Sequence, residues 1–80
     1  MDTDKIAQAY ARKISWDGVV RCGERNRYIY YSLYADRFTG KKIGQPAIIK
    51  IAPTTGAIIN IDRINEIMWA ISQINQRLPI

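Results

Sequence analysis

The stretch between Arg25 and Asp36 constrains the fold most, because its side chains alternate between two chemically different sets. If residues 27–35 form a strand, successive side chains point to opposite faces of a sheet. One face then carries Ile29, Tyr31, Leu33 and Ala35, and the other carries Tyr28, Tyr30, Ser32 and Tyr34. Because a domain of 80 residues covers one sheet face more easily than two, we expect the tyrosine face to point outward.

Two helical patterns flank this strand. Residues 4–14 carry apolar side chains at every fourth position, preceded by Asp and Thr side chains that suit a helix N-cap. Residues 61–78 form a longer helical pattern that Pro79 ends. Its apolar stripe consists of Ile61, Ile64, Ile67, Met68, Ile71, Ile74 and Leu78. We expect this stripe to be buried on the sheet face that carries Ile29, Tyr31 and Leu33.

Further β-prone segments lie on both sides of the tyrosine strand. Residues 19–22 lead into it through a loop that contains Gly23, and residues 46–53 form a third strand with prolines at its ends. Residues 57–59 can add a last short strand. The order predicts a single α+β domain over residues 1–80, with an N-terminal helix, a three-stranded antiparallel sheet and a long C-terminal helix packed on one sheet face.

The composition favours binding over catalysis. The chain has no histidine, and its seven acidic residues are scattered rather than paired, so general acid–base chemistry is poorly supplied. Cys22 is the only cysteine, and in a β-prone run we interpret it as a small buried apolar residue. Zinc and copper ligand sets are missing for the same reasons. We therefore expect no enzyme activity, no metal and no cofactor.

Net charge and hydropathy suggest where the protein works and what it meets. Twelve Lys and Arg residues against seven Asp and Glu give a charge of +5, which favours anionic partners but also fits simple solubility. The chain opens with an acidic, polar segment, and it has no apolar run long enough to span a bilayer. We expect a cytoplasmic protein that does not engage a membrane.

Basic and aromatic side chains cluster on and around the tyrosine face. The candidate binding residues are Arg25, Arg27, Tyr28, Tyr30, Tyr34, Arg37, Lys41, Lys42 and Lys50. Such a surface can stack unpaired bases on its rings and neutralise phosphates with its cations, or it can enter a duplex groove as a basic β-ribbon. The competing interpretation is that these rings pack under a helix or form a cross-strand ladder.

Two functions remain open at this point. The first hypothesis is a nucleic-acid-binding module, with DNA or RNA held on the tyrosine and arginine face. The alternative is a protein-interaction module, such as a small inhibitor or adaptor of the kind that mobile elements encode, which docks the same face on a protein. A homodimer through an exposed sheet edge or through Trp69 is a further form of this alternative. Trp69 lies off the apolar stripe, so it either covers the edge of the sheet or contacts a partner.

Overall fold

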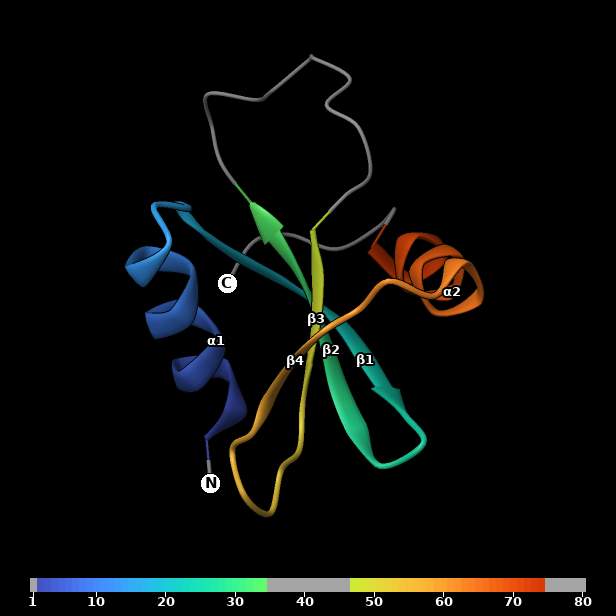
Figure 1. Cartoon of the computed structure of the whole chain (residues 1–80), viewed down its shortest axis with the longest axis horizontal. Coiled ribbons are helices and arrows are strands. Elements are labelled where there is room, and N and C mark those ends of the chain that lie inside the picture. The colour runs from blue at the N-terminus through green and yellow to red at the C-terminus, as the bar shows by residue number, and fades with distance from the viewer. Residues whose placement is uncertain (1, 35–46, 75–80) are drawn as a thin grey trace.

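Four antiparallel strands form one sheet, and a helix lies on each side of it (Figure 1). The structure is a computed structural model that describes residues 2–34 and 47–74. In chain order the elements are α1 (Thr3–Lys13), β1 (Gly18–Arg25), β2 (Tyr28–Tyr34), β3 (Ile48–Ile51), β4 (Ile58–Asn60) and α2 (Ile64–Ile74). The α+β architecture predicted from the order of the sequence patterns is confirmed.

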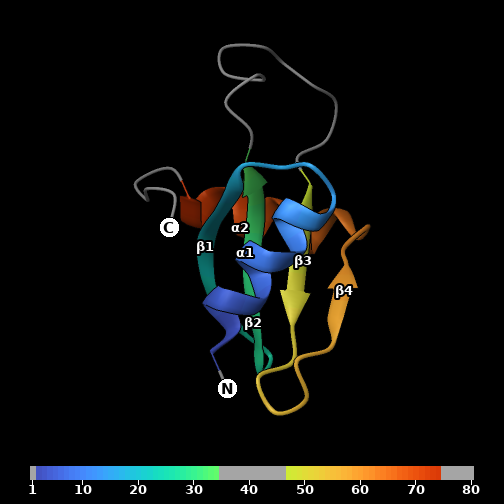
Figure 2. The same cartoon turned by 90° about the vertical axis from the view of Figure 1, so that its left-hand side faces the viewer.

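Each strand pairs with the next one along the chain, so the sheet order is β1-β2-β3-β4 (Figure 2). The sheet has four strands where the sequence analysis expects three, because the short isoleucine run at Ile58 and Ile59 completes a ladder with β3. The first strand is also longer than the predicted 19–22. A bulge between Arg21 and Gly23 lets its ladder with β2 continue to the turn.

The β1–β2 hairpin turns through only two residues, Asn26 and Arg27. Their φ angles are 52° and 69°, so both lie in the left-handed region. This is the backbone of a type I′ turn, whose twist matches the twist of the strands that it joins. Asparagine tolerates this conformation well, whereas arginine at the second position replaces the usual glycine.

Helix α1 covers the face that carries Ile29, Tyr31 and Leu33. Its N-cap is Asp2, whose side chain accepts a hydrogen bond from the Lys5 amide. Two helix residues, Ala7 and Ala11, are fully buried in the first core. The other buried members of this core are Val19, Ile29, Tyr31, Leu33, Ile49 and Ile51. The expectation that the C-terminal helix covers this face is therefore wrong.

Helix α2 lies on the tyrosine face instead, on the opposite side of the sheet from α1 (Figure 1). Ile67 and Ala70 contact a second core that contains Cys22, Tyr30 and Ile48. The expected outward orientation of the tyrosine face is consequently wrong for its centre. Two short helices cover both faces of this small sheet, and a tyrosine ring packs in a core like any large apolar group.

Candidate functional site

The predicted basic and aromatic surface lies on the α2 side of the sheet. Strand register places Arg25 opposite Tyr28, and Tyr30 opposite Lys50. Cross-strand neighbours share a face, so these four side chains form one group. Trp69 reaches the same group from α2, because its ring meets that of Tyr30 edge to face with the ring centroids 5.1 Å apart. We call these five residues the Tyr30 cluster.

Tyr30 is the centre of this cluster and is fully buried. Burial, and then the neighbouring Glu66 carboxylate, raise the pKa of the Tyr30 hydroxyl above its usual range. Gly23 lies opposite Tyr30 in the ladder, and a Cβ atom at Gly23 would stand 3.8 Å from the ring of Trp69. A ring held between β1, β3 and α2 cannot stack an incoming base, so Tyr30 is not part of an open binding platform.

The two cationic side chains of the Tyr30 cluster contact aromatic rings and a carboxylate of the same chain. The Lys50 ammonium lies 3.3 Å from a carboxylate oxygen of Glu66 and 4.6 Å from the ring centroid of Tyr28. The Arg25 guanidinium lies 5.5 Å from the ring centroid of Trp69. Cation–π contacts of this kind are attractive, and the ion pair spans from β3 to α2. The cluster therefore ties α2 to β1, β2 and β3.

The remaining predicted residues are distributed around this cluster. Arg27 is exposed at the tip of the β1–β2 hairpin, and Tyr34 is half-buried at the far end of β2. Arg37, Lys41 and Lys42 lie outside the described residues. Only Arg27 among the described candidates is thus a freely exposed cation, whereas Arg25 and Lys50 are partly buried.

Helix α2 exposes apolar side chains that the sequence analysis expects to be buried. Ile64 is 61% exposed and Met68 is 58% exposed, although both belong to the predicted stripe. They are four residues apart and therefore adjacent on the helix surface. The stripe is wider than the strip of sheet that α2 covers, so Ile67 is buried while Ile64 and Met68 face outward. The sequence carries a signal for these exposed side chains, because the predicted apolar stripe is too wide for all of its members to be buried.

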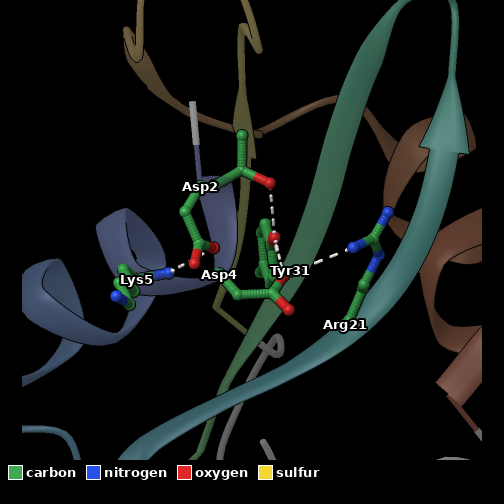
Figure 3. Close-up of polar contacts among 6 residues, drawn as sticks. Asp2, Asp4, Lys5, Arg21 and Tyr31 are labelled. Carbon is green, nitrogen blue, oxygen red and sulfur yellow. Dashed lines mark hydrogen bonds and ion pairs between the residues drawn. The ribbon is translucent and has the colours of Figure 1, made fainter.

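A second polar group, between α1 and the sheet, was not predicted (Figure 3). The buried Tyr31 hydroxyl donates a hydrogen bond to Asp4 and lies 2.8 Å from the Thr3 hydroxyl. Arg21, which stands opposite Tyr31 in the ladder, pairs with the same carboxylate at 3.4 Å. These side chains satisfy one another, and they fix the first turn of α1 on the sheet.

Metal-ligand clusters and membrane-spanning helices were sought in the part of the chain that the structure describes. Over residues 2–34 and 47–74, no three His, Cys, Asp or Glu side chains gather where they could hold a metal ion. None of the helices in these two ranges is long and apolar enough to cross a membrane. Cys22 is fully buried, as the sequence analysis expects.

Comparison with protein-family models, with curated proteins and with solved structures finds no match to this chain.

Proposed function

We propose that this protein is a small protein-interaction module that docks through the outer surface of α2. The observation that carries the proposal is the pair Ile64 and Met68, each more than half exposed and adjacent on successive turns of the helix. Single exposed apolar side chains are common on protein surfaces, but neighbouring ones mark surfaces that a partner covers. Methionine suits this role because its flexible side chain adapts to the shape of a partner.

The Tyr30 cluster supports this choice over the tyrosine platform. Its rings and cations are already engaged in fastening α2, and this engagement keeps the outer surface of α2 in a fixed position. A docking helix that is held rigidly loses less conformational entropy on binding. The charge of +5 favours an acidic partner, because opposite charge steers association and raises its rate.

Site-specific photo-crosslinking tests the proposal. A benzophenone side chain at position 68, in cells that naturally encode the chain, should give discrete protein adducts. The same probe at position 12, an exposed site on α1, is the matched control and should not give these adducts. Ile64→Asp in the chain that carries the probe should abolish them while circular dichroism stays unchanged. Identical adducts from positions 68 and 12, or adducts that survive Ile64→Asp, would contradict the proposal.

A second candidate function, nucleic-acid binding, is favoured by one observation at the hairpin tip. Arg27 is exposed and adopts a left-handed backbone with φ of 69°, where glycine is the usual residue. Arg25 and Tyr28 flank the same turn. An arginine held at a position that favours glycine is worth testing as a phosphate contact, since cationic side chains supply most of the affinity for a nucleic acid backbone.

The variant Arg27→Gly distinguishes an effect on nucleic-acid binding from an effect on stability, because the two are expected to change in opposite directions. The change should stabilise the fold by about 0.5–1 kcal/mol, because it relieves the left-handed strain. In fluorescence anisotropy with labelled DNA and RNA, it should weaken binding and reduce the salt slope by about one unit. Arg12→Gln, which removes an exposed charge on α1, is the matched control. Equal affinity of the wild type and the Arg27→Gly variant would exclude the hairpin tip as the contact.

A further inference from the structure

The two edges of the sheet differ in how they are protected against pairing with another strand. At β1 the edge carries a bulge beside Cys22, and the exposed Arg21 and Glu24 lie on either side of the bulge. Bulges and charged side chains are the usual means by which edge strands avoid addition of a further strand. At β4 the described residues include neither of these, and no described element lies beyond this edge (Figure 2).

The hydrogen bonds between β3 and β4 show which backbone groups of β4 point away from β3. Ile61 donates to the Ile48 carbonyl, and Ala52 donates to the Ala57 carbonyl. In an antiparallel ladder, hydrogen-bonded pairs alternate with non-hydrogen-bonded pairs, so Ile59 is the residue of β4 that bonds β3. The N–H and C=O groups of Ile58 and Asn60 consequently point away from the sheet.

We propose that β4 pairs with β4 of a second copy of this chain, in an antiparallel register with Ile59 on the two-fold axis. In this register, Ile58 of each copy lies opposite Asn60 of the other. These are the two residues whose backbone groups point outward, so all four hydrogen bonds of the two pairs can form. Strand β4 is therefore complementary to itself, and the dimer has one continuous sheet of eight strands.

Side chains and charge also favour a second copy as the occupant. The two Ile59 side chains form a close non-hydrogen-bonded pair, which covers a side chain that is 38% exposed in the single chain. Ile58, Ile59 and Asn60 carry no charge, and Lys50, which stands opposite Ile59, is neutralised by Glu66. Although each chain carries a charge of +5, the described residues of β4 and of the facing part of β3 thus bring no unpaired cation to this edge.

Amide hydrogen exchange at two protein concentrations tests the pairing directly. Between about 20 µM and about 2 mM, the range in which small interfaces assemble, exchange at Ile58 and Asn60 should slow several-fold. The Ile59 amide is an internal control, because its hydrogen bond to β3 exists in the single chain. Exchange rates at Ile58 and Asn60 that do not depend on concentration would overturn the proposal.

Charge variants at the two-fold axis test the register. Ile59→Lys and Ile59→Glu should each be monomeric in sedimentation velocity, because like charges face each other, whereas an equimolar mixture should form a heterodimer. Ile64→Lys places the same charge on α2 and should leave the wild-type dimer intact. This control separates the pairing from the proposed docking surface on α2. A dimer lost in Ile64→Lys but kept in Ile59→Lys would place the interface on α2 and reject pairing through β4.

Discussion

At the residue scale, Tyr31 shows how one hydroxyl links a helix to the sheet. The ring lies in the core under α1, while the hydroxyl reaches Thr3 and Asp4 in the first turn of that helix. Because Tyr31 donates to Asp4, the Thr3 hydroxyl donates to Tyr31. A buried hydroxyl with both a donor and an acceptor satisfied repays the cost of its desolvation.

We predict that Tyr31→Phe destabilises the fold by about 0.5–2 kcal/mol, because it leaves the buried Thr3 hydroxyl without this partner. Urea unfolding followed by circular dichroism measures the change. Tyr10→Phe is the matched control, because the contact of the Tyr10 hydroxyl with Asn60 is long, at 3.5 Å, and exposed. A loss of stability as large in Tyr10→Phe as in Tyr31→Phe would contradict this account.

The raised pKa of the Tyr31 hydroxyl makes the stability of the fold depend on pH. Burial, and then the hydrogen bond to Asp4, raise the pKa of Tyr31 to about 12, whereas an unfolded tyrosine titrates at about 10. Between these values the unfolded chain has lost a proton that the folded chain keeps, so the free energy of unfolding falls as pH rises. The stabilisation is complete below pH 10 and is lost as pH rises towards 12.

The pH dependence is best measured as a difference between two proteins. Urea unfolding at about pH 9 and about pH 11 should show a larger loss of stability for the wild type than for Tyr31→Phe, because only the wild type carries this titrating group. The other titratable groups are the same in both proteins. Parallel losses in the two proteins would show that Tyr31 titrates in the folded chain as it does in the unfolded one.

At the element scale, each helix is set against the sheet by alanines. Ala7 and Ala11 of α1, and Ala70 of α2, are fully buried. Small side chains at these positions let the helix backbone approach the strands closely, and the larger neighbours fill the space around them.

Ala11→Leu should therefore destabilise the fold by about 1–3 kcal/mol, because the added atoms overpack a filled core. Ala9→Leu makes the same change at an exposed position of the same helix and should alter stability by no more than about 0.5 kcal/mol. Chemical denaturation of both variants gives the comparison. If Ala11→Leu were as stable as Ala9→Leu, α1 would have to be free to shift on the sheet.

Local patterns predicted both helices and the first three strands, and they located the short run that forms β4. The helices expected at residues 4–14 and 61–78 correspond to α1 and α2, and the tyrosine strand corresponds to β2. Helix α2 begins at Ile64 rather than at residue 61, and residues 75–78 lie outside the described residues. Helical and strand periodicities depend on neighbours within one element, so they can be read from the sequence. The extension of β1 up to Arg25 depends on a bulge and a tight turn that alternation does not reveal.

The sequence did not show which helix covers which face. Both faces of β2 are apolar enough to be buried, and from Ile29 to Leu33 every residue of the strand is buried. A run of this kind is typical of a strand covered on both sides, and the tyrosines concealed it because they are also common on binding surfaces. The candidate site therefore differs from the predicted one. Helix α2 covers Tyr30, and the exposed apolar side chains on this helix are Ile64 and Met68.

At the scale of the whole molecule, two cores share one central strand. The first core contains Tyr31 and lies under α1, and the second contains Tyr30 and lies under α2. These tyrosines are consecutive in β2, so neither core can lose its strand while the other remains intact. A domain built in this way should unfold in one cooperative step.

The two tryptophans allow this cooperativity to be measured on each side of the sheet. Trp16 packs against the first core and Trp69 against the second, so Trp69→Phe leaves a fluorescent reporter for the α1 side and Trp16→Phe leaves one for the α2 side. In each variant, the urea midpoint from fluorescence should equal the midpoint from far-ultraviolet circular dichroism. A fluorescence midpoint below the circular dichroism midpoint in Trp16→Phe alone would show that α2 leaves the sheet before the rest unfolds. The Tyr30 cluster would then be too weak to hold α2 in place, and the rigid docking surface proposed for Ile64 and Met68 would lose its support.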